Sequence, residues 1–221
     1  MKRAIPFLLA CLIPGEAHAQ SGCALNYLDC NTHQFSSSAP TYSLFCPSEF
    51  QQYGSSTVDY DLIIGAFDAK GTGREYGTGG GLAVFDTYHL VGSSPHCGFT
   101  FTANLHVVGK ITRVNMFTGC DLYARLIDPN TLAESEFYLQ SQFTTAVDTV
   151  LTIVLTECSS PFDLQIEMHC GAWWGDVKEN MQLTFTGLPP GVSVTSCQGF
   201  HMEQPVATVP VTWGNVRARY R

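Results

Sequence analysis

The feature that most constrains the fold is a strict alternation of apolar and polar residues over short runs. From Phe99 to Val107 every second residue is apolar, and the residues between them are Thr, Asn or His. A period of two places successive side chains on opposite faces, as in a β-strand that is buried on one side. No part of the chain shows a convincing 3.6-residue period, so the sequence predicts an all-β fold.

Strand-like runs of this kind recur along most of the chain, separated by turn signals such as Lys70–Gly73, Asp128–Asn130 and Leu188–Gly191. Short strands at this spacing are typical of an antiparallel β-sandwich or jelly roll. We therefore predict a disulfide-stabilised antiparallel β-sandwich or jelly roll. The expected strands are 58–67, 81–91, 98–107, 111–117, 122–127, 137–143, 149–156, 162–170, 181–186 and 192–197.

Composition excludes two classes of protein. The 221 residues are 45% hydrophobic and only 14% charged, with a net charge of −8. Intrinsic disorder requires low hydrophobicity, which this chain lacks. A nucleic-acid partner is also excluded, because 11 basic residues against 19 acidic ones leave little from which to build a basic face.

The N-terminal residues 1–19 have the layout of a secretory signal. Lys2 and Arg3 precede an apolar run over 4–14, and Ala17–Ala19 supplies a small-x-small cleavage site. No later run approaches the 18 apolar residues of a membrane span, so we expect no transmembrane segment. The expected location is outside the cell or at the cell surface, with the periplasm as an alternative.

Three segments follow the signal. Residues 20–57 are rich in Ser, Gln and Cys and are expected to form a cysteine-containing N-terminal extension. Residues 58–200 hold the expected sandwich domain, and residues 201–221 form a C-terminal tail. That tail ends in a basic stretch with Arg217, Arg219 and Arg221.

Cleavage after Ala19 leaves an even number of cysteines, which in an exported chain points to disulfides. No Cys-x-x-Cys occurs, which argues against a redox centre or a zinc knuckle. We expect four bridges, of which one follows from geometry. A hairpin symmetric about Val108-Gly109 would place Cys97 opposite Cys120 and predicts that these two are paired. The pairing of the other six is undetermined: Cys23, Cys30, Cys46, Cys158, Cys170 and Cys197.

The segment 71–81 is rich in glycine. Phosphate-binding loops of this composition lead into a helix, whereas the next residues here are strand-like, so a long flexible hairpin connection is the favoured interpretation. Its tip, Arg74, Glu75 and Tyr76, is a candidate ligand-binding loop.

Aromatic residues suggest sugar binding, since flat rings stack on the apolar faces of sugars. Trp173 and Trp174, with Tyr138 and Trp213, are the candidates for such a platform. Adjacent strand residues face opposite sides, so we expect at most one of the two adjacent tryptophans to be exposed, and Trp174 is retained as a candidate contact.

Metal and catalytic sites have weaker signals. Asp59, Asp61 and Asp68 are weak calcium candidates, although alternate acids on a strand more often mark a solvated face. The histidines show no metal-ligand spacing, and no cofactor is indicated. Two carboxylate pairs could serve a glycosidase only if folding placed them across a groove: Glu134 with Glu136, and Glu157 with Asp163.

Two passages carry a resemblance. Residues 183–200, LTFTGLPPGVSVTSCQGF, resemble late strands of predicted extracellular β-sandwich proteins of bacteria. Residues 211–221, VTWGNVRARYR, are similar to the endings of uncharacterised exported bacterial proteins. The resemblance implies a sandwich and an extracellular destination, and it transfers no catalytic or ligand residues.

These observations favour an exported, non-catalytic surface or binding module whose partner is an extracellular glycan or protein. One alternative is an enzyme that acts on extracellular polysaccharide through paired carboxylates. Another is a structural or assembly component whose basic tail engages a partner.

Overall fold

The computed structural model describes residues 26–30, 33–37, 39–47, 54–74, 77–92, 99–156 and 161–203. All regular elements within these ranges are β-strands, as the alternation predicts. They are β1 (Asn26–Cys30), β2 (His33–Ser37), β3 (Thr41–Pro47), β4 (Gly54–Asp61), β5 (Ala66–Gly73), β6 (Thr78–Gly92), β7 (Thr100–Arg113), β8 (Gly119–Asp128), β9 (Ala133–Ser141), β10 (Thr145–Thr156), β11 (Phe162–Trp173), β12 (Gly175–Thr186), β13 (Val192–Ser196) and β14 (His201–Glu203).

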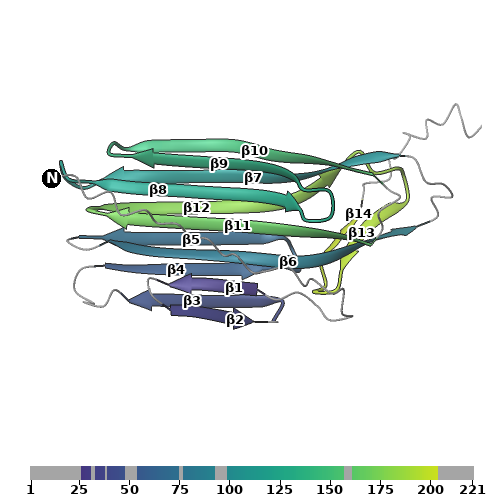
Figure 1. The fold of residues 1–221 in the computed structure, drawn as a ribbon, viewed down its shortest axis with the longest axis horizontal. Helices are drawn as coiled ribbons and strands as arrows, with labels where there is room; N and C mark the ends of the chain where they lie inside the picture. The colour runs from purple at the N-terminus through teal and green to yellow at the C-terminus, as the bar shows by residue number, and fades with distance from the viewer. Residues whose placement is uncertain are drawn as a thin grey trace, which may run out of the picture.

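The described strands form two antiparallel sheets that make a sandwich, which confirms the predicted architecture. The eight-stranded sheet has the order β14-β13-β6-β11-β8-β9, with β1 paired to β6 and β2 paired to β1. The six-stranded sheet has the order β10-β7-β12-β5-β4-β3. Most strands run along the long axis of the molecule, with β13 and β14 at one end (Figure 1). From β5 onward the chain changes sheet at most connections, so neighbouring strands are distant in sequence.

The core fills the space between the two inner faces, where every second residue of most strands is buried. Its aromatic centre is built around Tyr88 of β6. The Tyr88 and Phe162 rings stack with centroids 5.6 Å apart, and Phe101 meets Phe162 edge-on at 5.4 Å. Full burial of each such side chain contributes about 2 kcal/mol to folding. These rings come from both sheets and therefore hold the sandwich together.

The predicted hairpin about Val108-Gly109 is wrong. Strand β7 passes straight through these residues, and β8 lies in the other sheet. Gly109 is buried, and a Cβ at this position would lie 2.7 Å from Leu122 Cδ1. The glycine therefore allows the two sheets to approach closely, and the inward alternation continues through it to Ile111.

The predicted Cys97–Cys120 bridge is also wrong, because Cys120 is a free, buried thiol. Cys170 is also free and buried. In the antiparallel register Cys120 lies opposite Ala172, which places the two thiols diagonally on adjacent strands. Diagonal neighbours are about 7–8 Å apart, beyond the usual Cα separation of a disulfide.

Two other cysteines, Cys46 and Cys197, are disulfide-bonded. Cys23, Cys97, Cys158 and the side chain of Cys30 lie outside the described residues. With Cys120 and Cys170 free, the eight expected cysteines cannot form four bridges, and the remaining connectivity stays a prediction.

Several boundaries differ from those expected. Part of the expected N-terminal extension is integral to the sandwich, since β1 pairs with β6 and β3 pairs with β4. Lys70–Gly73 is not a turn but the end of β5. The connection between β5 and β6 is short and joins the two sheets, so it is not the expected long hairpin.

Candidate functional site

The outer face of the eight-stranded sheet gathers aromatic and ionisable side chains from three adjacent strands. Tyr138 of β9 lies opposite Tyr123 of β8, and Tyr123 lies opposite His169 of β11. Trp173 follows on β11, four residues beyond His169 and on the same side of the strand. We call these four residues, Tyr123, Tyr138, His169 and Trp173, the tyrosine face.

Only one of the two adjacent tryptophans is exposed, as expected. The exposed one is Trp173 and not the retained candidate Trp174. The Trp173 side chain is exposed, at 54%, while Trp174 is half-buried at the bend that follows β11. Tyr138 is 59% exposed on the same side as Trp173. The structure thus places Trp173 and Tyr138 on one face, and Trp213 lies outside the described residues.

A histidine–carboxylate pair lies in the middle of this face. His169 Nδ1 is 3.2 Å from Asp121 Oδ2, and both side chains are about one-third exposed. A Cβ at Gly171 would overlap Asp121 Oδ1, and one at Gly79 would lie 3.3 Å from His169 Nε2. Glycines at these two positions therefore leave the space in which the paired side chains lie close to the sheet.

A network centred on Arg125 borders the tyrosine face. Arg125 donates to the Glu134 carboxylate and lies 3.6 Å from Glu167 Oε2. The Glu134 hydrogen bond raises the pKa of Arg125, so the guanidinium stays charged. The Tyr123 hydroxyl is 3.5 Å from Glu167 Oε2. These contacts hold the polar groups in place before any ligand arrives.

The two tyrosine hydroxyls remain protonated donors. Burial, followed by the negative charge of Glu167, raises the pKa of Tyr123. Burial and then the charge of Asp121 raise the pKa of Tyr138. Each phenol can therefore donate a hydrogen bond at neutral pH as well as present a ring face.

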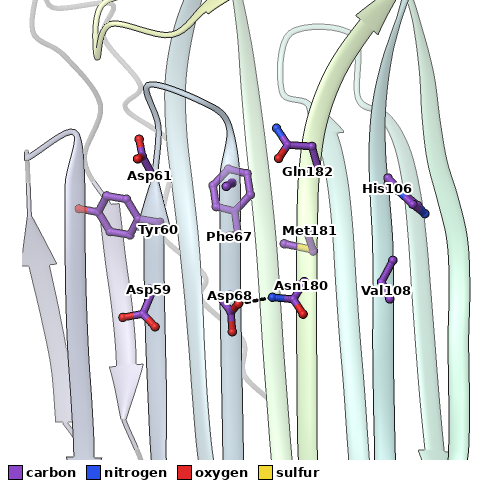
Figure 2. Close-up of a pocket in the computed structure, with 11 residues that line it drawn as sticks. Asp59, Tyr60, Asp61, Phe67, Asp68, His106, Val108, Asn180, Met181 and Gln182 are labelled. Atoms are coloured by element: carbon purple, nitrogen blue, oxygen red, sulfur yellow. Dashed lines mark hydrogen bonds between the residues drawn. The ribbon is translucent and has the colours of Figure 1, made fainter.

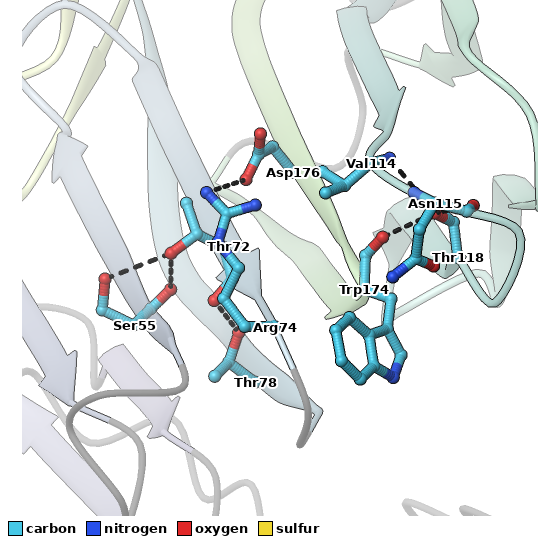
Figure 3. Close-up of polar contacts among 9 residues, drawn as sticks. All are labelled: Ser55, Thr72, Arg74, Thr78, Val114, Asn115, Thr118, Trp174 and Asp176. Carbon is cyan, nitrogen blue, oxygen red and sulfur yellow. Dashed lines mark hydrogen bonds and ion pairs between the residues drawn. The ribbon is translucent and has the colours of Figure 1, made fainter.

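Of the sequence-predicted loop contacts, the structure describes Arg74, which Figure 3 shows beside Asp176. Arg74 follows β5, and its Nη2 is 3.9 Å from Asp176 Oδ1 at the start of β12. Glu75 and Tyr76 lie outside the described residues. The structure thus explains the position of Arg74 by an ion pair across two neighbouring strands, and its role in ligand contact stays a prediction.

Trp174 is the single residue that connects β11 of one sheet to β12 of the other, since β11 ends at Trp173 and β12 begins at Gly175. Its φ is 54°, in the left-handed region that bulky residues rarely adopt. The buried Thr118 donates its hydroxyl to the Trp174 carbonyl, a contact that Figure 3 shows. This residue therefore serves the crossing, which a sequence pattern alone does not reveal.

The weak calcium candidates lie on the outer face of the six-stranded sheet (Figure 2). They line a shallow depression of about 360 Å³ together with His106, Asn180 and Gln182. Asp59 lies opposite Asp68, which accepts a hydrogen bond from Asn180 and lies 3.3 Å from Lys70 Nζ.

Asp61, the third candidate, binds backbone groups of the turn that follows β4. Its Oδ1 accepts the backbone N–H groups of Ile63 and Ile64 at 3.0 and 3.4 Å. Within the described ranges, no three side chains of His, Cys, Asp or Glu are grouped so that they could hold a metal ion. Asp61 therefore acts as a turn residue and Asp68 as an ion-pair residue here.

Two carboxylates of the predicted catalytic pairs, Glu134 and Asp163, bind side chains of neighbouring strands. Glu134 and Glu136 both lie on β9, and Glu134 is bound by Arg125. Asp163 accepts hydrogen bonds from Thr87 Oγ1 at 2.7 Å and Asn130 Nδ2 at 3.4 Å. Its expected partner, Glu157, lies outside the described residues.

Sequence reasoning missed Asp121, Tyr123 and Arg125. A signal was present, because these three residues alternate along β8 and so must share one face. The alternation does not reveal which strand is the neighbour. β8 pairs with β11, and only that pairing brings His169 beside Tyr123, which is 46 residues away in the sequence (169 − 123).

No protein-family model matches the chain, and no curated protein matches it. Two solved structures are similar in part. One is described as a study of "the promiscuous specificity of the carbohydrate-binding modules from the beta-sandwich super family", with 10% identity, a TM-score of 0.26, and coverage of 75% of this chain and 86% of the other. The second is the enzymatically active domain of tailspike protein 4 from bacteriophage CBA120, with 11% identity, a TM-score of 0.19, and coverage of 73% and 19%. At these scores neither likeness carries an argument about function. In the described part of the chain no helix is long and apolar enough to cross a membrane.

Proposed function

We propose that this protein is an exported, non-catalytic carbohydrate-binding β-sandwich and that its tyrosine face holds an oligosaccharide. The observation that carries the proposal is the alignment of Tyr138, Tyr123 and His169 across three adjacent strands. Aromatic rings offer apolar surface that matches the apolar faces of sugar rings, and the phenol and imidazole groups add hydrogen bonds.

The spacing of the exposed rings favours a chain of sugars over a single one. Trp173 and Tyr138 are separated by two inter-strand steps and by four residues along the strand direction. Standard strand dimensions place them roughly 17 Å apart. A ligand that touches both rings must therefore extend over the Asp121–His169 pair between them.

The polar groups beside the rings suit a neutral sugar. Asp121, Arg125 and Glu167 can accept from or donate to hydroxyl groups. The Arg125–Glu167 and Asp121–His169 pairs already restrict their positions. Preorganised groups lose less conformational entropy when a ligand binds. This arrangement supports recognition of hydroxyl patterns.

The positions of two carboxyl groups with a raised pKa, Asp86 and Glu179, favour binding over hydrolysis. Burial raises the pKa of Asp86 to about 6 and that of Glu179 to about 9. Both side chains are buried on inner faces of the sheets. A glycosidase needs its proton-donating carboxyl beside the bound sugar, and these two lie in the core.

A glycan-array screen of the oxidised, full mature protein tests the proposal, followed by calorimetry on the strongest hit. Tyr138→Ala should weaken binding about tenfold, the size expected when one stacked ring is lost. Phe45→Ala is the matched control, because Phe45 is an exposed aromatic residue on a strand of the other sheet. An array without glycan hits, or equal loss in both variants, would contradict the assignment.

Export is tested separately. We expect the protein recovered from outside the cytoplasm to begin at Gln20, because the small-x-small motif ends at Ala19. N-terminal sequencing of the exported protein checks this. Recovery of a chain that still begins at Met1 would refute the signal assignment.

A further inference from the structure

A row of lysines crosses the outer face of the six-stranded sheet. Lys178 of β12 lies directly opposite Lys70 of β5 on one side and Lys110 of β7 on the other. All three side chains are exposed. We call these residues the lysine row. The whole chain has only four lysines, and the fourth is Lys2.

This concentration of positive charge is unusual for a chain with a net charge of −8. Like charges directly opposite each other on neighbouring strands destabilise a sheet. Here two such pairs share one residue, Lys178. The arrangement therefore carries a local electrostatic cost, and that cost is removed when an anion binds across the row.

Nearby carboxylates neutralise the row only in part. Lys70 is paired with Asp68 at 3.3 Å, while Asp176 is paired with Arg74 and Asp148 with His106. Within the described residues, neither Lys110 nor Lys178 has an ion pair. The row ends in the uncharged Thr57 and Ala146, which lie opposite Lys70 and Lys110.

We propose that the lysine row binds a linear acidic polysaccharide through its carboxylate or sulfate groups. Neighbouring strands are about 4.8 Å apart, so the three ammonium groups span about 10 Å in a line. Lysine ammonium groups are compact point charges on flexible stems and adapt to anions along a chain. This surface lies on the sheet opposite the tyrosine face and does not depend on it.

Two features of the same face favour a polysaccharide over other polyanions. Asp59, Asp61 and Asp68 lie beside the row. A flat anionic membrane would bring its negative charges close to these carboxylates. A narrow chain lies along the row and avoids them. The facing positions of β5, β7 and β12 carry no Phe, Tyr or Trp side chain on which nucleic-acid bases could stack.

Affinity electrophoresis of the full chain tests this assignment, with polygalacturonate and dextran sulfate as acidic probes and dextran as the neutral one. We expect retardation by at least one acidic probe and none by dextran. The double variant Lys110→Gln/Lys178→Gln should bind at least about fivefold more weakly, as expected for the loss of two exposed ion contacts. Binding should also fall in 0.5 M salt, because screening shortens the range of exposed charges.

The matched control is Lys110→Arg/Lys178→Arg, which keeps both charges and should bind within about twofold of the parent protein. Thermal unfolding of the Gln variant should show a Tm equal to or above that of the parent, because two like-charge contacts are removed. Tyr138→Ala should leave binding of the acidic probes unchanged, which separates this surface from the tyrosine face. Undiminished binding by the Gln variant would overturn the proposal. So would capture by phosphatidylserine vesicles without retardation by either acidic polysaccharide.

Discussion

Glu179 provides the most direct test of the energetics of this fold. It lies on the inner face of β12 with no exposed surface, and neither carboxyl oxygen has a hydrogen-bond partner. Its neighbours across the strands are Ala69 and Gly109, neither of which offers a polar side chain. Burial, followed by the charge of Asp121, raises the pKa of Glu179 to about 9.

The sign of the effect on stability follows from proton binding. Between its ordinary value of 4.5 and about 9, Glu179 holds a proton in the folded state and loses it on unfolding. The folded state thus binds more protons, so the free energy of unfolding falls as the pH rises. The slope is about 1.4 kcal/mol per pH unit, which amounts to about 2.5 kcal/mol between pH 5 and pH 7.

The perturbation is Glu179→Gln, which keeps the size of the side chain and removes its titration. Guanidinium unfolding at pH 5, 6 and 7 gives the free energy of unfolding of both proteins. Between pH 5 and pH 7, we expect the free energy of unfolding of the variant to rise by about 2.5 kcal/mol relative to that of the parent. Asp86 is also buried with a raised pKa, but it is present in both proteins and cancels in the difference. Parallel pH profiles would refute the claim that Glu179 is protonated in the core.

Three further outcomes are expected. Alkylation of the denatured, unreduced protein should label Cys120 and Cys170, while the native protein should resist labelling because burial raises the pKa of both thiols; a disulfide-linked peptide that contains either one, found by mass spectrometry, would contradict this. Gly171→Ala should displace the side chain of Asp121 and weaken glycan binding about tenfold by calorimetry, and unchanged affinity would argue against the close approach described above. Leu132→Gly should raise the free energy of unfolding by about 0.5 kcal/mol in denaturant titrations, because Leu132 is 79% exposed with a φ of 59°; a loss of stability would show that its side chain packs more than its exposure suggests.

The sequence alone predicted the class of the fold because burial on one face imposes a period of two on every strand. The run from Phe99 to Val107 lies within or beside β7 with the expected side inward, and most other runs match observed strands. The error at Gly109 arose because a glycine in a strand and a glycine in a turn look the same in sequence. Only the packing of Leu122 against Gly109 distinguishes them.

The partners of each strand were decided by the tertiary structure. Local alternation determines which side chains share a face, as with Asp121, Tyr123 and Arg125, but it contains no information on the neighbouring strand. Because the chain changes sheet at most connections, β8 meets β11 and β7 meets β12 across long sequence separations. Those pairings create both the tyrosine face and the lysine row. Hydrophobic burial is encoded residue by residue, whereas register depends on how two whole sheets pack.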